Sequence, residues 1–501
     1  MASSTSKYLL GVDNGGTMSK AALFDTDGRE LACASRKVVH LELHPGWSER
    51  DADTMWEDTA DAIREVIETS GVDAVDIAGV ACTGHGNGLY LVDENGDPVR
   101  NGINSMDSRA ASYIEEWIAA GVDERVLPMT TQCLWPAQPN ALLAWLRDHE
   151  AETLERADWV LFAKDFIRTR LTGEIWMERT DMSGSSLMNV VTGEYDDAVL
   201  EAFGLLDTKS LLPPLRNSHD ICGAVTADAA ERTGLAEGTP VAGGMFDIDA
   251  CGLASGIIDE GQMSLVAGTW GNNQYIAREP LVDKDLFMTT CYSVPGWFLM
   301  LEGSPTSAGN LEWFVSRFVE QEEEGGAAVY QRCDEAVAVI DPADEDIIFL
   351  PFLYGTNEKS SAKSSFLGLE EHHTRDDMLR AVYEGIVFSH NHHLQRLLQF
   401  RDKPESIRMT GGAAHSEVWV QMFADCFQIP VEVPTGSELG ALGAAIAAAV
   451  ATGVYPGYRE AVAGMTSVAR RYEPDPMKGG VYAAKYQRYK KAVAALDELW
   501  K

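Results

Sequence analysis

At 501 residues the chain is too long for one compact core, so we expect two domains of ordinary size. Its composition, with 45% hydrophobic and 23% charged residues, is typical of a globular protein with a large core. The formal net charge of -37 argues against nucleic acid and anionic membranes as partners, because both would repel the chain. It does not exclude a nucleotide, since backbone amides and a metal ion can hold phosphates locally.

Cysteine usage and the N-terminal residues indicate the compartment. The eight cysteines are scattered and form no Cys-x-x-Cys pair, which favours reduced thiols over disulfides or zinc. Residues 1–7 lack the charged start and apolar core of a secretory signal. The longest apolar-looking segment, Gly440 to Val450, is mostly Ala and Gly and too short to span a bilayer. We therefore expect a soluble cytoplasmic protein.

The first chemical motif is a turn between two apolar strands near the N-terminus. Residues 8–12 predict a strand, Asp13-Asn14-Gly15-Gly16-Thr17 a tight turn, and residues 20–25 a second strand. A plain β-hairpin explains this pattern by itself. However, Asp13 at the strand end can hold a hydrated Mg²⁺ ion, and the glycines let backbone amides approach phosphate oxygens.

A second pair of polar clusters can meet hydroxyl groups. The buried strand predicted for residues 77–82 runs into Thr83-Gly84-His85-Gly86-Asn87-Gly88, where His85 and Asn87 can line a site. For His85 taken alone, a structural role is equally well supported. Asp107 lies in the next polar cluster, and its alternative role is simply to pair with Arg109.

Asp247 stands at the centre of the segment Val241 to Ala250. It follows a short strand with a Gly-rich end and precedes a run of small residues that predicts a closely packed helix. Open α/β sheets place reacting groups at such strand ends. The alternative is that Asp247 or Asp249 only caps the following helix.

The second half repeats the strand-and-turn pattern. Residues 263–267 predict a strand that ends in Gly268-Thr269-Trp270, and Thr410-Gly411-Gly412-Ala413 ends another strand before a helix starting near Glu417. The second geometry suits a nucleotide base or ribose on bare backbone. His390, His392 and His393 lie on an apolar helix without carboxylate or thiolate partners at metal spacing, which favours helix packing over a metal site.

Taken in order, these motifs resemble the carbohydrate kinases of the FGGY family. The resemblance covers nearly the whole chain, and its most specific part is Ser364 to Leu369 followed after seven residues by Asp377 to Glu384. One departure lies in Pro139 to Leu146, where Leu142 stands at a position that is usually lysine in the family.

The resemblance implies an α/β fold of two actin-like (ribonuclease H-like) domains around an interdomain catalytic cleft that binds ATP, Mg²⁺ and a sugar or polyol. It implies a sugar-binding domain over 1–252, with Asp247 as general base near its end, and a nucleotide-binding domain over 253–501. Asp13 would hold the metal, and the phosphates and nucleotide would be bound by Gly15, Gly16, Thr17, Gly268, Thr269, Gly411, Gly412 and Ala413. Phosphoryl transfer needs little beyond such positioning, charge neutralisation and one proton acceptor.

Within the family, several stretches are similar to the L-xylulose kinases. They are His44 to Asp51, Thr131 to Trp135, Ser304 to Phe314 and Phe352 to Asn357. The D-xylulose kinases carry Gln-Met-His-Gly at His85 to Gly88, and the glycerol kinases carry Arg-Glu at Gly86 and Asn87, so this chain departs from both. The resemblance implies phosphorylation of L-xylulose to L-xylulose 5-phosphate, with His85, Asn87, Asp107, Trp135 and Asp247 as candidate substrate contacts.

Other functions stay open at this point. A site of hydroxyl-binding groups can also accept a polyol such as erythritol, or the related 3-keto-L-gulonate. From a different class come a catalytically silent sugar-binding regulator and an actin-like assembly protein. The intact Asp247 and the absence of a basic DNA-binding segment argue against the regulator. Sugar and ATP are the expected partners, nucleic acid and membrane are not, and a homodimer is compatible with the family.

Overall fold

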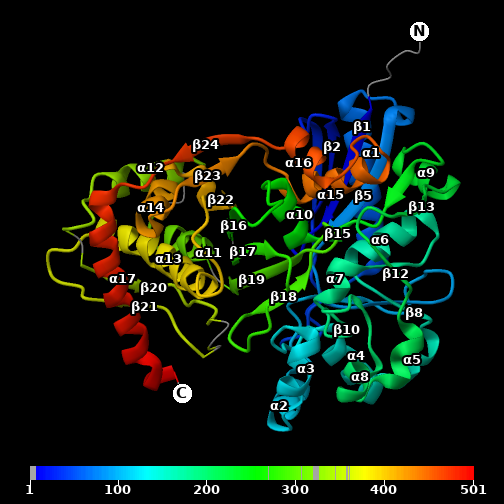
Figure 1. Ribbon diagram of the computed structural model, residues 1–501, viewed down its shortest axis with the longest axis horizontal. Coiled ribbons are helices and arrows are strands. Elements are labelled where there is room, and N and C mark those ends of the chain that lie inside the picture. The colour runs from blue at the N-terminus through cyan, green and yellow to red at the C-terminus, as the bar shows by residue number, and fades with distance from the viewer. Residues whose placement is uncertain are drawn as a thin grey trace. The chain divides into compact units, whose positions relative to one another are not determined.

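A computed structural model describes residues 7–268, 270–305, 307–319, 327–344, 346–356, 359 and 361–500. The chain forms two compact units, each built from segments that are distant in sequence (Figure 1). Unit 1 comprises Met1–Ile258, Ile276–Met300 and Gly436–Ser467, and unit 2 comprises Asp259–Tyr275, Leu301–Thr435 and Val468–Lys501. The predicted α/β class is confirmed, and the described residues include two seven-stranded sheets. The assignment of sugar binding to 1–252 and nucleotide binding to 253–501 stays a prediction.

The sheet of unit 1 follows the strand order β13-β14-β5-β1-β2-β3, with β15 paired to β5. The hairpin strands β1 and β2 are antiparallel, whereas β5 runs parallel to β1. Side chains of β1 alternate between two cores, because successive residues of a strand point to opposite faces. The strands are β1 (Tyr8–Asn14), β2 (Met18–Asp25), β3 (Glu30–Lys37), β5 (Ile77–Gly84), β13 (Ile221–Ala224), β14 (Pro240–Ala242) and β15 (Met245–Phe246).

Helices cover both faces of this sheet (Figure 1). α1 (Ala52–Ser70) and α6 (Ala163–Thr172) pack on one face, and α10 (Asp247–Ala254) and α15 (Leu439–Ala451) on the other. Small residues let α15 approach the sheet very closely: a Cβ atom on Gly11 of β1 would lie 1.8 Å from the Ala441 carbonyl oxygen. Consequently α15 lies directly against β1.

The other elements of unit 1 lie outside this sheet, and their strands pair elsewhere. They are β4 (Glu49–Arg50), β6 (Tyr90–Val92), β7 (Gly102–Ile103), α2 (Ala111–Ala119), α3 (Val122–Thr130), α4 (Pro139–His149), α5 (Ala151–Arg156), β8 (Trp159–Leu161), β9 (Met177–Glu178), α7 (Arg179–Ser183), β10 (Met188–Asn189), β11 (Glu194–Tyr195), α8 (Asp197–Ala202), β12 (Leu215–Arg216), α9 (Ala227–Thr233), β18 (Met288–Cys291) and α16 (Tyr458–Met465).

The second sheet follows the order β18-β19-β17-β16-β22-β23-β24. β16 and β17 form an antiparallel hairpin, and β22 runs parallel to β16. The strands are β16 (Gln262–Ala267), β17 (Gly271–Ala277), β19 (Phe298–Ser304), β22 (Ser406–Thr410), β23 (Val431–Pro434) and β24 (Val468–Tyr472); the remaining elements are α11 (Gly309–Phe314), α12 (Ala327–Ala338), β20 (Ile348–Leu350), β21 (Ser365–Leu367), α13 (Arg375–Leu397), α14 (Glu417–Phe427) and α17 (Pro476–Leu496).

Two sequence signals are seen directly in unit 2. α13 begins with a reciprocal capping box, in which Thr374 and Asp377 each accept a hydrogen bond from the other's backbone amide. α14 begins at Glu417, where the sequence predicts a helix start.

Over the part of the chain that the structure describes, no helix is both long and apolar enough to cross a bilayer.

Candidate functional site

Asp13 ends the central strand of unit 1 with an unsatisfied carboxylate. Its neighbours across the sheet are Lys20 on β2 and Thr83 on β5. A Cβ atom on Gly440 would lie 2.3 Å from Asp13 Oδ2, so the first turn of α15 lies against the carboxylate. Asp13 Oδ1 is buried and has no hydrogen-bond partner. Burial raises the pKa of Asp13 to about 6, with Glu438 adding to the rise and Lys20 opposing it.

The turn after Asp13 has the predicted hairpin form. Gly15, Gly16 and Thr17 connect β1 to β2, and Thr17 is exposed. A Cβ atom on Gly16 would meet nothing within 4 Å, so the space around that residue is open. The open backbone is what a phosphate contact needs, although the phosphate role of this turn stays a prediction.

Lys20 and Glu438 form an ion pair next to Asp13 that sequence reasoning missed. Lys20 Nζ lies 2.7 Å from Glu438 Oε2. Glu438 immediately precedes α15, and both side chains act electrostatically on Asp13. The hairpin register, which pairs Asp13 with Lys20, is a signal that can be read from the sequence. No local pattern indicates that Glu438, from the far end of the chain, pairs with Lys20.

Asp247 is the first residue of α10, directly after β15. The helix has Phe246 at its N-cap and no side-chain cap, so the simple capping role for Asp247 is not observed. Burial and, to a smaller extent, the negative charge of Asp13 raise the pKa of Asp247 to about 7, against the opposing effect of hydrogen bonds from the backbone amides of Ile248 and Asp247 itself. A carboxylate that titrates near neutrality is suited to accept a proton.

The segment that delivers Asp247 is held from two sides. Gly244 has a φ of +79°, and a Cβ atom there would lie 1.9 Å from the Cys82 carbonyl oxygen, so only glycine fits this approach to β5. Thr83 Oγ1 donates to the Met245 carbonyl at 2.8 Å, and the Phe246 amide donates to Thr180 Oγ1 at 2.9 Å. These contacts fix the start of α10.

Asp249, the second aspartate of α10, has a different environment. Its Oδ1 accepts hydrogen bonds from the Ser293 amide at 2.8 Å and from Ser293 Oγ at 3.0 Å. Burial raises its pKa well above the usual range. This residue therefore ties α10 to the segment after β18.

The donor set at Asp13 fits a hard divalent cation. Its unpartnered oxygen and the nearby charge of Asp247 leave local negative charge that a cation would neutralise. Among the residues that the structure describes, no cluster of three or more Asp, Glu, His or Cys side chains surrounds a metal position. Few protein ligands is the usual pattern for Mg²⁺, which keeps waters and binds substrate phosphates.

The His85 and Asn87 loop lies against the residue that precedes Asp247. A Cβ atom on Gly86 would fall 2.0 Å from the Phe246 ring. Asn87 has a φ of 59° and a buried Oδ1 without a hydrogen-bond partner. His85 Nδ1 is likewise buried without a partner, so both side chains carry free polar capacity near the start of α10.

His85 is held neutral by its surroundings. Burial and, to a smaller extent, the positive charge of Arg50 lower its pKa to about 4. Its Nε2 lies 3.4 Å from the Tyr90 hydroxyl. A neutral imidazole can donate or accept a single hydrogen bond at Nδ1, as a hydroxyl-bearing ligand requires.

Trp135 belongs to a loop that joins the His85 loop. The Gly88 amide donates to the Ala137 carbonyl at 3.0 Å, which connects the two loops. Trp135 Nε1 has no hydrogen-bond partner, and its ring packs edge-on against Phe287 with centroids 5.8 Å apart. The structure thus places Trp135 in the neighbourhood of His85 and Asn87.

Asp107 is fully engaged by other groups. Its Oδ1 accepts from the Arg109 amide and Nε, both at 2.9 Å, and its Oδ2 accepts from Arg109 Nη2 at 2.9 Å and the Ser48 amide at 2.7 Å. Arg109 also contacts Glu49 at 2.8 Å and stacks over Trp47 at 4.1 Å. This network supports the alternative that Asp107 serves to pair with Arg109, and its substrate role stays a prediction.

Asp181 is a second residue that the sequence analysis does not single out, because its polar run over residues 180–186 is compatible both with a cleft lining and with a plain loop. It is buried on α7, neither of its carboxylate oxygens has a hydrogen-bond partner, and Lys164 Nζ lies 3.4 Å away. Burial raises its pKa well above the usual range, and the charge of Asp247 adds to the rise. Lys164 is therefore the nearest charged partner of this carboxylate.

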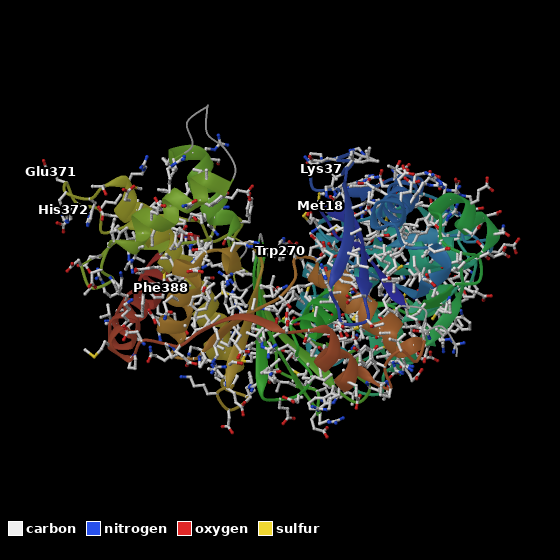
Figure 2. All side chains as sticks on the ribbon, turned by 90° about the horizontal axis from the view of Figure 1, so that it is seen from above. Met18, Lys37, Trp270, Glu371, His372 and Phe388 are labelled. Carbon is white, nitrogen blue, oxygen red and sulfur yellow. The ribbon has the colours of Figure 1, made fainter. Side chains whose placement is uncertain are left out.

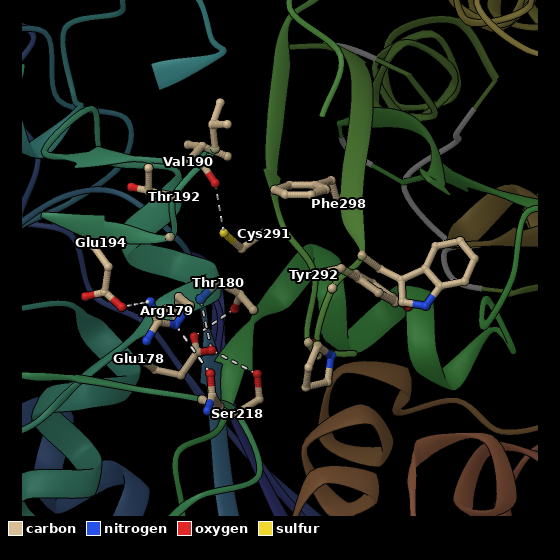
Figure 3. Close-up of a pocket in the computed structure, with 17 residues that line it drawn as sticks. Glu178, Arg179, Thr180, Val190, Thr192, Glu194, Ser218, Cys291, Tyr292 and Phe298 are labelled. Carbon is tan, nitrogen blue, oxygen red and sulfur yellow. Dashed lines mark hydrogen bonds and ion pairs between the residues drawn. The ribbon is translucent and has the colours of Figure 1, made fainter. Parts of the chain in front are cut away.

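A cavity of about 350 Å³ opens in unit 1 on residues that hold α10 in place (Figure 3). Its walls include Thr180 and Ser293, the hydrogen-bond partners of Phe246 and Asp249. Figure 3 shows Arg179 reaching Glu194, at 3.1 Å, on the same side as Glu178. None of the predicted site residues lines this cavity.

The nucleotide candidates of unit 2 gather at the end of β16. Gly268 begins the turn to β17, and its amide donates to the Trp270 carbonyl at 3.1 Å. Gly411 has a φ of +88°, and a Cβ atom there would lie 2.8 Å from the Gly268 nitrogen. Gly412 and the buried Ala413 begin a 3₁₀ helix, and a Cβ atom on Gly412 would meet nothing within 4 Å. Thr269 lies outside the described residues.

Trp270 closes this turn with a 41% exposed side chain (Figure 2). Gly268, Gly411 and Gly412 therefore form a backbone surface with little side-chain obstruction, as the sequence predicts. Such a surface can bind phosphate or nucleotide groups through amides.

Comparison with known proteins agrees with this chemistry. The N-terminal domain of the FGGY family of carbohydrate kinases matches residues 8–253, and the C-terminal domain matches residues 263–452. The L-xylulose/3-keto-L-gulonate kinase of Escherichia coli K12 is 39% identical over 98% of this chain and 97% of its own length. A probable L-xylulose kinase of Pasteurella multocida is 38% identical over 98% of this chain and 99% of its own length.

Solved structures show the same architecture. The crystal structure of xylulose kinase from Rhodospirillum rubrum superposes with a TM-score of 0.89 at 27% identity, covering 99% of this chain and all of that one. The ligand-bound xylulose kinase from Lactobacillus acidophilus has a TM-score of 0.90 at 23% identity over 98% of both chains, a likeness of fold. The fold and the site thus define a phosphotransferase of the carbohydrate kinase class. The chain belongs to the FGGY family of carbohydrate kinases, whose members use ATP.

Proposed function

We propose that this protein transfers the γ-phosphoryl group of ATP to the terminal hydroxyl of a ketose, with Asp247 as general base. The observation that carries the proposal is the environment of Asp247. Its carboxylate lies at the start of a helix, is held by β5 and α7, and has a pKa raised to about 7 by burial and by Asp13. A base of that pKa accepts a proton and is not saturated with protons at neutral pH.

The proposed reaction is a direct displacement. The substrate hydroxyl gives its proton to the Asp247 carboxylate while its oxygen forms a bond to the γ-phosphorus. The bond between the γ-phosphorus and the bridging oxygen to the β-phosphate breaks, and ADP leaves with that bond's electron pair. Asp247 then releases the proton to solvent, so the products are the sugar phosphate, ADP and one proton.

The remaining candidate residues bind and orient the reactants. Gly15, Gly16 and Thr17 of unit 1 and Gly268, Thr269, Gly411, Gly412 and Ala413 of unit 2 would bind phosphates and nucleotide. Asp13 would hold Mg²⁺, which when bound neutralises phosphate charge. The unpartnered Asp13 Oδ1 supports this role. The open Cβ directions at Gly16 and Gly412 support the backbone contacts.

L-xylulose is the substrate that we propose, and 3-keto-L-gulonate is its nearest alternative. Two relatives named for these substrates align with 98% of the chain. His85 Nδ1 and Asn87 Oδ1 lie unpartnered beside Phe246 and can form hydrogen bonds to sugar hydroxyls. The free thiols of all eight cysteines support a reducing, cytoplasmic location.

The experiment is a measurement of ADP release from ATP and Mg²⁺ with a panel of acceptors. The panel contains L-xylulose, D-xylulose, 3-keto-L-gulonate, L-ribulose, erythritol and glycerol. We expect the highest kcat/KM for L-xylulose or 3-keto-L-gulonate. Preferred turnover of erythritol would make the protein a polyol kinase. Sugar and ATP binding without turnover of any acceptor would overturn the catalytic proposal in favour of a sugar-binding regulator.

A further inference from the structure

His390 on α13 is connected to the turn that carries Gly268, within unit 2. Ser307 Oγ lies 2.7 Å from His390 Nε2, and both side chains are only 2% exposed. The next residue, Ala308, donates its backbone amide to the Gly268 carbonyl at 2.8 Å. A short chain of contacts therefore runs from the imidazole through residues 307 and 308 to the proposed phosphate-binding turn.

The other side of the imidazole contacts β17, the strand that leaves the same turn. His390 Nδ1 lies 3.4 Å from Asn273 Oδ1. A Cβ atom on Gly271 would fall 2.9 Å from the imidazole Cε1, so glycine is what lets the ring pack against the strand. The ring thus contacts the hairpin on one side and the Ser307 segment on the other.

The protonation state of His390 fits this arrangement. An oxygen at Nδ1 places the ring proton there, which leaves Nε2 as the acceptor for the Ser307 hydroxyl. Burial lowers the pKa of His390 to about 3, with a smaller effect from His393, so the ring stays neutral. The sequence indicated only helix packing for this histidine, whereas the structure gives both its nitrogens specific partners.

We propose that His390 is a positioning residue for the phosphates of ATP, acting through Ser307 and Ala308 on the Gly268 turn. The inference rests on the proposed function, because it takes Gly268 as a phosphate contact. Loss of the Ser307 contact leaves a buried polar atom unpaired and frees the turn to move. A displacement of a positioning group by about 1 Å is enough to weaken phosphoryl transfer substantially.

The test uses four variants of the full chain: His390→Leu, His390→Gln, Ser307→Ala and the double variant His390→Leu/Ser307→Ala. The control is His372→Leu, which changes an exposed histidine of the same unit (Figure 2). The measurements are the Kd for ATP by calorimetry, KM for ATP and for the sugar, kcat, and the unfolding midpoint.

We expect His390→Leu and Ser307→Ala each to raise Kd and KM for ATP about tenfold, the effect of one buried hydrogen bond, while KM for the sugar changes less than about twofold. His390→Gln, which can still accept from Ser307, should recover most of the affinity. The Kd for ATP of the double variant should not exceed the higher of the two single-variant values, because both substitutions remove one shared interaction.

Three outcomes would overturn the inference. They are unchanged ATP affinity in Ser307→Ala, equal losses for ATP and sugar, and a lower unfolding midpoint with both KM values intact, which indicates packing alone. If the wild-type protein turns over sugar while the variants bind ATP normally, the inference fails and the proposed function stands. If the wild-type protein binds no ATP, the proposed function fails first.

Discussion

Two groups of carboxylates in unit 1 differ in how their charges are satisfied. The paired group consists of Glu49 and Asp107, whose oxygens contact Arg100 and Arg109. All four acceptor bonds of Asp107 are made within the protein. The open group consists of Asp13 and Asp247: the charge of Asp13 raises the pKa of Asp247, and Asp13 Oδ1 is buried without a hydrogen-bond partner.

This difference separates structural from catalytic carboxylates more clearly than residue type does. A buried charge with complete hydrogen bonding is held in place for the fold, and a ligand can reach it only by displacing its partners. A buried carboxylate that has an unpaired oxygen or a like charge beside it costs stability in the free protein and is tolerated where binding or chemistry uses it.

The largest expected effect is the loss of turnover in Asp247→Asn. The amide is nearly isosteric but cannot accept the substrate proton, so kcat should fall about a thousandfold, within the range for general-base catalysis. Steady-state ADP release measures kcat, and calorimetry with ATP checks binding.

The control is Asp228→Asn, which makes the same change at an exposed first-turn residue of α9. Its kcat should stay within about twofold of the wild type. Near-normal turnover in Asp247→Asn, with the control also active, would show that another group is the base.

The pH dependence of kcat/KM of the wild-type enzyme should reflect the pKa of Asp247. Only the deprotonated Asp247 can act as base, and its pKa in the free protein is raised to about 7. We therefore expect kcat/KM to reach a plateau above about pH 7 and to fall about tenfold per pH unit below it. A profile of kcat/KM from pH 5 to 9 measures this. A flat profile between pH 5.5 and pH 8 would exclude a base of this pKa.

Asp107→Asn should affect stability more than catalysis. The substitution removes one of the two carboxylates that contact buried Arg109, while Glu49 keeps its contact, so the free energy of unfolding should fall by about 1–3 kcal/mol. Chemical denaturation measures this, and KM for the sugar should change less than about threefold. The control Asp197→Asn breaks an ion pair with Lys209 whose side chains are about half exposed, and it should cost less than about 1 kcal/mol.

A clear rise in KM for the sugar with normal stability would reverse this assignment. Asp107 would then be a substrate contact despite its four internal hydrogen bonds. Complete hydrogen bonding of a carboxylate would then not distinguish structural from catalytic residues in this protein.

The contrast also explains how much of the site could be predicted. The turn after β1, the strand end before Asp247 and the glycines at 268, 411 and 412 are local patterns, and the structure shows each in the predicted setting. The fold followed from the family resemblance and is confirmed. These features depend on residues that are neighbours in sequence, where hydrophobic patterning and glycine placement are informative.

The features that escaped prediction depend on distant partners. Glu438 reaches Lys20 across 418 residues, and nothing in the local sequence of either residue indicates the other. Asp181 and Asp107 both lie in short polar runs, yet only the structure shows that the first lacks hydrogen-bond partners and the second has four. Whether the oxygens of a carboxylate have hydrogen-bond partners depends on packing, which cannot be read from the local sequence.

The smallest expected effect is a gain of stability in Asp247→Asn. The pKa of Asp247 is raised from 3.8 to about 7 in the folded protein, so the unfolded chain ionises this group first. Its contribution to folding is therefore fully favourable below about pH 4 and is lost as the pH rises to about 7. This rise in pKa corresponds to about 4 kcal/mol at full ionisation. The amide never ionises, but it also accepts more weakly from the backbone amides of Ile248 and Asp247, so we expect a net gain of about 1–2 kcal/mol, or a few °C, at pH 8 and an unfolding temperature near the wild-type value at pH 4.

Thermal denaturation of both proteins at the two pH values measures this difference, without ligands. Asp228→Asn, whose carboxylate is exposed, should show no such pH-dependent gain. Added Mg²⁺ and ATP should reduce the advantage of Asp247→Asn, since a bound cation offsets the repulsion between Asp247 and Asp13. If the variant is less stable than the wild type at pH 8, the Asp247 carboxylate is satisfied in the free protein, and the open group is not distinguished from the paired group by its cost to the fold.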